Sequence, residues 1–299
     1  MHPPYLKPGD TVGLVCTARS FSADEVEGIR PLLESWGLTL KLGKTIGAIE
    51  NQFGGSDTLR QQDLQEMLDD PSVAAVFCAR GGYGTVRILD GLDWNSFTEK
   101  PKWIVGFSDV TALHATCQNE TGIASLHGPL LSTLLATDSE SVEAMRAQLF
   151  GEMTAYDFSV NEMNKLGIAE GTLVGGNLSV LYSLLGSTSF PDTDGAILFL
   201  EDLDEYRYHI DRMMMALKRA GKLSGLAGVL VGGFAAIHDN AIPFGLSAEA
   251  IIVEHLEEYA IPMGFGFPAG HGKENMPLII GSHVAITLNM REAKISWEA

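Results

Sequence analysis

The sequence has few cysteines and few basic residues, and each shortage excludes a class of protein. Its three cysteines, Cys16, Cys78 and Cys117, form no Cys-x-x-Cys pair, so we expect neither a disulfide framework nor a cysteine metal site. Lys and Arg total 20 against 38 Asp and Glu, which gives a formal net charge of −18. Because nucleic acids and anionic membranes attract clustered cations, this balance argues against both as partners.

Long apolar runs are also missing. No stretch approaches the roughly 18–20 apolar residues that are needed to cross a bilayer. The first twenty residues lack the basic and then apolar segments of a secretory signal peptide, so we expect a cytoplasmic protein. The hydrophobic share of 45%, with 33 Gly and 12 Pro, is typical of a globular protein with many turns. A length of 299 residues exceeds the usual single core and predicts two domains.

The first half of the chain alternates short apolar runs with amphipathic segments. Runs at 11–16, 73–80 and 102–107 are apolar on both faces, as in a parallel sheet that helices cover on both sides. Helix starts are marked by Ser22, which forms a capping-box pattern with a Glu three residues later, and by Ser56. The segment 85–92 is predicted to be a short helix.

The alternation breaks over residues 151–167, and the second half mixes patterns. A Gly-Gly turn is predicted between a strand and a helix that begins at Asn177, and residues 283–297 alternate like a hairpin with its turn around 289–292. We therefore predict an α/β protein. Its parallel-sheet domain covers residues 1–160, and a smaller, β-rich α+β domain with a mixed sheet covers 161–299.

Glycines crowd the corner that follows the apolar run 73–78. The sequence Gly81-Gly82-Tyr83-Gly84 leaves backbone N–H groups unshielded before a helix, which favours binding of an anion or an oxyanion. It does not match a dinucleotide fingerprint, because Arg87 stands near the place of the third glycine. A purely structural turn is an equal alternative for this corner.

A second corner places Ser108 between an apolar run and a helix. The sequence Gly106-Phe107-Ser108-Asp109 matches part of a nucleophile elbow, in which a serine occupies a strained strand-to-helix turn. The second glycine of that pattern is absent. Since serine and aspartate are common helix caps, capping is the more frequent explanation for such a corner taken alone.

A serine nucleophile needs a base, and three histidines are candidates. His114 lies six residues along the same helix, roughly 9 Å from Ser108, and cannot easily turn back to it. His127 ends a strand and could line a pocket. His271 lies in a loop between two glycines, which suits a side chain that projects into a site, although a solvated loop histidine is an equal alternative.

The base needs an orienting acid, for which Glu201 is the candidate. It directly follows the apolar run 196–200, so it is expected to be half-buried at a strand end and to need a partner. Favourable electrostatics at a helix start is the alternative role. Because ligands bind at the carboxyl ends of parallel strands, these corners should be read together.

Together the corners resemble a known family, the L,D-carboxypeptidases, which include muramoyl-tetrapeptide carboxypeptidases and microcin-immunity peptidases. The resemblance rests on six stretches in order along nearly the whole chain: ARGGYGTVRIL (79–89), KWIVGFSDVTALHA (102–115), HGP (127–129), GTLVGGNLSVL (171–181), LFLEDLDEYRYHIDRMM (198–214) and FGFPAGHGKENMPLIIG (265–281). It implies an N-terminal parallel α/β domain and a smaller β-rich C-terminal domain. One departure is VGGF at 231–234, where an acidic residue is expected after the first glycine.

The resemblance also implies roles for individual residues. Ser108 would be the nucleophile, His271 the general base and Glu201 the acid that orients it. The backbone N–H of Asp109 and one N–H from Gly81 or Gly82 would form the oxyanion hole. No metal or cofactor is expected, since the sequence has no His-Glu-x-x-His motif.

Three functions stay open at this point. The leading one is release of D-alanine from cytoplasmic murein tetrapeptides, the second is cleavage of a peptidyl-nucleotide antibiotic or another amide, and the third is binding of a small molecule without catalysis. An added aromatic residue near the site would favour a nucleobase. Arg80 is a candidate for the substrate carboxylate, or else a tie between loops. A homodimer is one assembly that we consider, and the sequence leaves the oligomeric state open.

Overall fold

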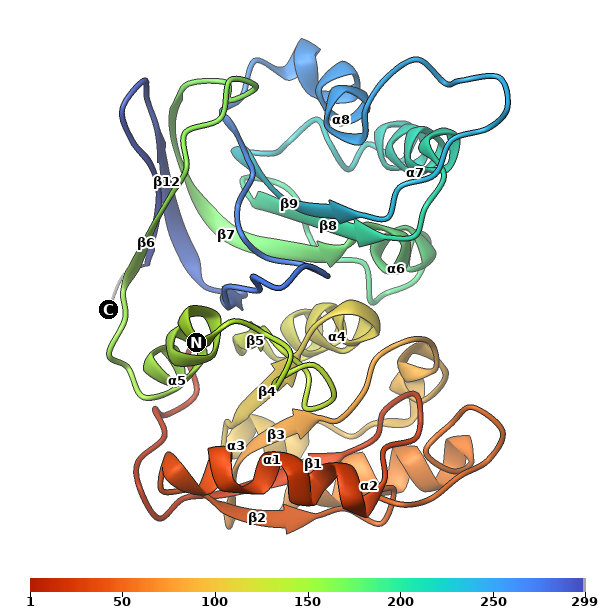
Figure 1. Cartoon of the computed structure of the whole chain (residues 1–299), viewed down its shortest axis with the longest axis vertical. Coiled ribbons are helices and arrows are strands. Elements are labelled where there is room, and N and C mark those ends of the chain that lie inside the picture. The colour runs from red at the N-terminus through yellow and green to blue at the C-terminus, as the bar shows by residue number, and fades with distance from the viewer. Residues whose placement is uncertain (298–299) are drawn as a thin grey trace.

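The computed structural model describes residues 1–297, which form two sheets flanked by helices (Figure 1). The first sheet has the order β11-β5-β4-β3-β1-β2, in which only β11 is antiparallel to its neighbour. Its strands are β1 (Thr11–Val15), β2 (Thr39–Leu42), β3 (Val73–Cys78), β4 (Trp103–Gly106), β5 (Ser125–His127) and β11 (Leu278–Ile280). The helices that accompany it are α1 (Ala23–Ser35), α2 (Asp57–Asp69), α3 (Asn95–Glu99), α4 (Thr111–Thr121) and α5 (Ser139–Leu149).

The second sheet is mixed and has the order β10-β9-β8-β7-β12-β13-β6. Strands β7 to β10 run parallel, while β12, β13 and β6 pair antiparallel. Its strands are β6 (Ala155–Phe158), β7 (Gly167–Asn177), β8 (Ile197–Leu203), β9 (Gly228–Ala235), β10 (Met263–Phe265), β12 (His283–Leu288) and β13 (Ala293–Trp297). Helices α6 (Leu178–Ser183), α7 (Arg207–Arg219) and α8 (Ala248–Leu256) lie beside it (Figure 1).

The predicted helix starts and the predicted hairpin are confirmed. Ser22 and Glu25 form a reciprocal capping box at α1, and the Ser56 hydroxyl accepts the N–H of Leu59 at α2. Strands β12 and β13 pair antiparallel around a turn in which the Asn289 N–H donates to the Glu292 carbonyl. The two-sheet α/β architecture agrees with the predicted fold class.

Two local predictions are wrong. Residues 85–92 form two 3₁₀ turns, Thr85–Arg87 and Leu89–Gly91, because eight residues with Gly91 among them are too few to sustain an α-helix. The expected Gly-Gly turn is instead part of β7, with Gly175 and Gly176 at φ +109° and +139°. A Cβ on Gly176 would lie 2.6 Å from the Thr111 hydroxyl, so glycine lets the start of α4 approach the strand closely.

The division into residues 1–160 and 161–299 stays a prediction, and two strands lie across it. β6 precedes residue 160 but pairs with β13 in the second sheet, while β11 follows residue 161 and pairs with β5 in the first. Both buried apolar clusters contain residues of both sheets. Within residues 1–297, no helix combines the length and the apolar character that crossing a bilayer requires.

Candidate active site

The backbone at Ser108 has the strained geometry of an elbow. Ser108 directly follows Phe107 at the end of β4 and has φ +63°, in the left-handed region that non-glycine residues seldom adopt. A 3₁₀ turn, Ser108–Val110, leads straight into α4. No side chain caps either element, so neither Ser108 nor Asp109 serves as the helix cap that the sequence alone would favour.

The structure brings Ser108, His271 and Glu201 into one hydrogen-bonded chain. The Ser108 Oγ lies 3.0 Å from the His271 Nε2, and the His271 Nδ1 lies 2.7 Å from the Glu201 Oε2. With Nδ1 protonated towards the carboxylate, Nε2 is free to accept the serine proton. Glu201 is on β8 and fully buried, and His271 projects from the loop between β10 and β11 with a side chain that is 14% exposed.

The surroundings of His271 set its charge preference. Burial is the largest influence on its imidazole and acts to lower the pKa, but the hydrogen bond and charge of Glu201 and the charge of Asp202 together raise the pKa above its usual value. The pKa of Asp202 itself is raised to about 7, mainly by burial and also by the neighbouring charge of Glu201. Hydrogen bonds from the Leu203 N–H and the Asn177 amide act in the opposite direction and lower this pKa.

Gly81 is the glycine that lies beside the serine. A Cβ on Gly81 would be 3.4 Å from the Ser108 Cβ and 3.5 Å from its Oγ, whereas a Cβ on Gly82 would meet the Arg19 side chain at 2.5 Å. Within residues 1–297, the backbone N–H groups of Gly81 and Asp109 donate to no protein acceptor. Both donors are therefore available to an oxyanion at this corner.

The glycine turn is tied to the elbow by buried polar groups. The Asp109 carboxylate accepts the N–H of Thr85 at 2.8 Å, and burial raises the pKa of that carboxyl although the Thr85 and Gly84 N–H groups oppose the rise. Arg60 on α2, which is fully buried, donates to the carbonyls of Gly84 and Thr17. Sequence reasoning missed Arg60, although its place one turn before Leu64 marked it as lying on the inward face of the helix.

Arg80 makes contacts that tie loops together. Its guanidinium donates to the Glu25 carboxylate at 2.5 Å and to the Ser20 carbonyl at 3.3 Å, and it lies 5.6 Å from the centre of the Phe21 ring. These three partners all belong to the start of α1 and the segment before it. The guanidinium is therefore already paired within the protein.

The other two candidate histidines lie beneath the site. His114 donates from Nε2 to the Gly106 carbonyl at 2.8 Å, and burial lowers its pKa to about 4. His127 packs between Phe107 and Phe199, fully buried, with both ring nitrogens unpartnered in the described part of the chain. Its burial holds the pKa well below the usual value, so both imidazoles are neutral.

The described residues offer no evident metal centre, and all three cysteines are buried free thiols. No group of three or more His, Cys, Asp or Glu side chains in residues 1–297 could hold a metal ion. Burial raises the pKa of each thiol to about 12, so Cys16, Cys78 and Cys117 are inert.

Comparisons with known proteins agree on one family. Residues 12–128 match the model of the LD-carboxypeptidase N-terminal domain, and residues 170–286 match the model of the corresponding C-terminal domain. The chain is 39% identical to the "Probable murein peptide carboxypeptidase" of Bacillus subtilis, over 98% of this chain and 93% of the relative. It is 29% identical to the murein tetrapeptide carboxypeptidase of Pseudomonas aeruginosa, over 88% and 89% of the two chains.

Solved structures share the fold. The microcin C7 self-immunity protein MccF in complex with aspartyl sulfamoyl adenosine superposes with a TM-score of 0.88 at 23% identity, covering 99% of this chain and 98% of that one. The muramoyltetrapeptide carboxypeptidase from Oxalobacter formigenes superposes with a TM-score of 0.87 at 24% identity, over 97% of this chain and 99% of that one. With both family models matched in order and a relative 39% identical along nearly its whole length, the chain belongs to the LD-carboxypeptidase family of serine peptidases.

Proposed function

We propose that the protein is a serine L,D-carboxypeptidase that releases the terminal D-alanine from murein tetrapeptides in the cytoplasm, as part of peptidoglycan recycling. The observation that carries the proposal is the hydrogen-bonded chain from Ser108 through His271 to Glu201. The names of the relatives from Bacillus subtilis and Pseudomonas aeruginosa support a murein peptide as the substrate. The homodimer considered above stays a prediction.

In the proposed mechanism, Ser108 attacks the carbonyl between the L-configured centre of the third residue and the terminal D-alanine. The His271 Nε2 takes the serine proton and returns it to the leaving amine, so the bond breaks without an unstable amide anion. Glu201 accepts the Nδ1–H and thereby holds the tautomer in which Nε2 is the acceptor. Water then hydrolyses the acyl-enzyme by the same proton transfers in reverse.

The negative charge of the tetrahedral intermediate needs fixed donors. The free N–H groups of Gly81 and Asp109 are the donors that we propose, because both adjoin Ser108 and neither has an acceptor in the described residues. Each donor of this kind contributes about 3–4 kcal/mol to transition-state stabilisation in serine peptidases. Gly81 is preferred to Gly82 as the second donor, because Gly82 faces the Arg19 side chain and not Ser108.

A peptidyl-nucleotide substrate is the second candidate. Tyr206 and Tyr208, which follow Glu201 by five and seven residues, are 42% and 38% exposed, and their rings lie 5.6 Å apart. Exposed aromatic faces of this kind can stack on a nucleobase. The murein peptide is preferred because the relatives with the higher sequence identity carry that name.

Replacement of Ser108 by alanine tests the proposal directly. Wild-type protein is expected to release D-alanine from an L,D-tetrapeptide, and Ser108→Ala to lose at least about a thousand-fold in kcat while keeping its circular dichroism spectrum. Ser96→Ala, at an exposed position of α3, is the matched control and should keep full activity. Persistent release by Ser108→Ala would remove the nucleophile assignment, and a wild-type protein that cleaves no such peptide would remove the function.

A further inference from the structure

Of the four arginines around the carboxyl ends of β1 and β3, one has no acidic partner. Arg60, Arg80 and Arg87 each form an ion pair with a carboxylate. The exposed Arg19, four residues after β1, forms no ion pair and donates no side-chain hydrogen bond to any other of residues 1–297. Because the chain carries 38 acidic residues against 20 basic ones, a guanidinium without an acid is a notable exception. It is available to an anion from outside the protein.

Arg19 also lies at the point where the first sheet changes direction. The chain passes from β1 to β2 on one side and from β3 to β4 on the other, so a crevice forms outside the carboxyl ends of β1 and β3. Open parallel sheets bind their ligands in this crevice. Arg19 follows β1, Gly82 follows β3, and a β-bridge to Phe53 holds the Arg19 backbone in place. The arginine is therefore fixed at the edge where a substrate is expected.

Gly82 leaves the space that the Arg19 side chain occupies. A Cβ on Gly82 would lie 2.5 Å from the Arg19 Nε and 2.7 Å from its Cδ, so the arginine packs directly over the bare glycine backbone. At the preceding residue, a Cβ on Gly81 would lie 3.5 Å from the Ser108 Oγ. The two consecutive glycines thus lie between the nucleophile and the guanidinium.

The separation of these two groups suits the end of a peptide. Ser108 and Arg19 follow strands that are two places apart in the sheet, at about 10 Å. A serine oxygen poised for attack lies about 3 Å from the carbonyl carbon. The carboxylate of a single leaving residue lies about 4 Å beyond that carbon, and a guanidinium binds a carboxylate at about 3 Å. One terminal residue therefore spans the distance from Ser108 to Arg19.

We propose that Arg19 binds the terminal carboxylate of the substrate and thereby restricts cleavage to the last residue of a peptide. Its planar guanidinium offers two parallel N–H donors, which match the two oxygens of a carboxylate. Arg80, the candidate from the sequence, is already paired with Glu25 and the Ser20 carbonyl. The inference rests on the proposed function, and it names the side chain that recognises the free carboxylate of D-alanine.

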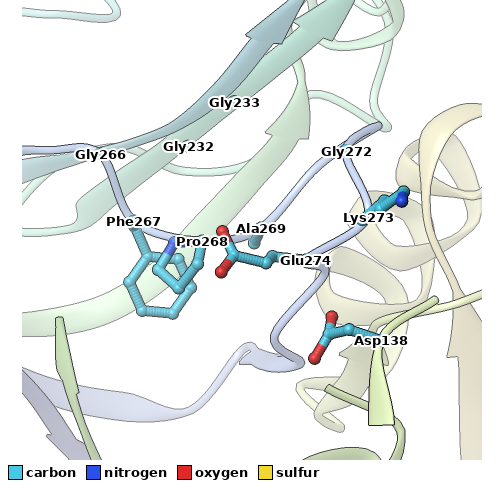
Figure 2. A pocket seen from close by; sticks show the side chains of 10 residues that line it. All are labelled: Asp138, Gly232, Gly233, Gly266, Phe267, Pro268, Ala269, Gly272, Lys273 and Glu274. Carbon is cyan, nitrogen blue, oxygen red and sulfur yellow. The ribbon is translucent and has the colours of Figure 1, made fainter. Parts of the chain in front are cut away.

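Lys273 is the alternative cation near the site. It lies two residues after His271 and forms no ion pair within residues 1–297, and Figure 2 shows its amine turned away from the neighbouring Glu274 carboxylate. Its ammonium is a point charge without the paired donors of a guanidinium. Arg19 is preferred because it also adjoins the turn that carries the proposed oxyanion donor.

Two tetrapeptides test the assignment, one ending in D-alanine and one in D-alaninamide, which keeps the size but loses the charge. Wild-type enzyme should cleave the carboxylate peptide with kcat/KM about ten-fold or more above the amide, as hydrogen bonds to a charged group imply. Arg19→Gln should reduce that preference to about two-fold and leave the rate with the amide unchanged. Arg291→Gln, at an exposed arginine between β12 and β13, is the matched control and should keep the full preference.

The ratio of the two rates is measured on one preparation, so it does not depend on the fraction of protein that is folded. Arg19→Lys should keep a preference of about three-fold or more, since the charge remains but the paired donors are lost. An Arg19→Gln protein with the wild-type preference, a wild type without a preference, or a Lys273→Gln protein that loses it would overturn this inference alone. A wild-type enzyme that cleaves neither peptide would overturn the proposed function and this inference with it.

Discussion

At Ser108 the side chain and the backbone make opposite demands. The proposed reaction needs a hydroxyl at the tip of the corner, but φ +63° is a region in which any residue with a Cβ is strained. Gly106 lets the turn close, since a Cβ there would lie 2.9 Å from Val110 and 3.1 Å from Leu130. The second glycine of the elbow pattern would fall at Val110, whose φ of −68° is open to any residue, so no glycine is needed there.

The strain at Ser108 predicts a difference between two inactive variants. Ser108→Gly and Ser108→Ala both remove the hydroxyl, but only glycine adopts φ +63° without cost. We expect the glycine variant to be more stable than the alanine variant by about 1 kcal/mol in the free energy of unfolding. Urea denaturation followed by circular dichroism measures the difference, and equal stability would show that the corner relaxes.

The pair of His271 and Glu201 predicts a shift in the pH profile. The proposed base, His271, works only as neutral imidazole, so activity is expected to fall as the pH drops through its pKa. Because Glu201 raises that pKa, Glu201→Gln should lower it and move the acid limb of kcat/KM to lower pH, while the maximal rate falls with loss of the fixed tautomer. Titration of the rate from pH 5 to pH 9 gives both quantities.

The matched control for this shift is Glu34→Gln. Glu34 is an exposed acid on α1 that faces Arg30, so its loss should leave the acid limb in place. An acid limb of Glu201→Gln that stays with the wild type, or that moves to higher pH, would contradict the assigned electrostatics.

At the scale of elements, the glycine turn after β3 predicts opposite effects for neighbouring substitutions. Gly81 has an ordinary φ, so Gly81→Ala should fold, but its methyl group would crowd Ser108 and Leu130 at the place of the oxyanion and lower kcat about ten-fold or more. Gly82 has φ +105°, so Gly82→Ala should cost about 1 kcal/mol or more in stability, with less effect on kcat per folded molecule. Steady-state kinetics and urea denaturation of the two proteins separate the effects, and the reverse order would point to Gly82 as the donor.

The elements themselves were largely predictable, since caps and periodicity are local signals. Ser22, Ser56 and Asn177 start helices as predicted, and the alternation over 283–297 is a hairpin. What local patterns cannot supply is the partner of a strand. The short β11 has three buried residues and pairs with β5, which lies about 150 positions earlier in the chain. The sequence of β11 alone does not indicate which strand is its partner.

The same limit applied to the site. Serine, glutamate and histidine corners were visible because each follows an apolar run, and the family resemblance assigned their roles. The contacts that hold them were not visible: the buried Arg60 against the Gly84 carbonyl, and the Thr111 hydroxyl that accepts the Asn177 N–H. Such contacts join residues that are distant in sequence, so they cannot be predicted from the spacing of residues within one segment.

At the scale of the whole molecule, the proposed triad is divided between the two sheets. Ser108 follows a strand of the first sheet, whereas Glu201 lies in the second and His271 on the loop that returns from the second to the first (Figure 1). A side-chain chain with hydrogen bonds of 3.0 and 2.7 Å tolerates little relative movement of the two sheets if it is to act as proposed. The core that joins them is therefore part of what positions the site.

This shared core predicts that the protein unfolds as one unit. One apolar cluster contains Val15 of β1 and Val174 of β7, and the other contains Val12 of β1 and Leu173 of β7, so neither sheet can lose its packing alone. Calorimetry should give a single transition whose van't Hoff and calorimetric enthalpies agree.

Leu278→Ala in β11 removes a buried side chain of the first sheet from a segment near the end of the chain, at a cost of about 2–5 kcal/mol in the free energy of unfolding. Because that strand connects both parts, the whole transition should move to lower temperature without splitting, and two separated peaks in either protein would show that the sheets unfold independently.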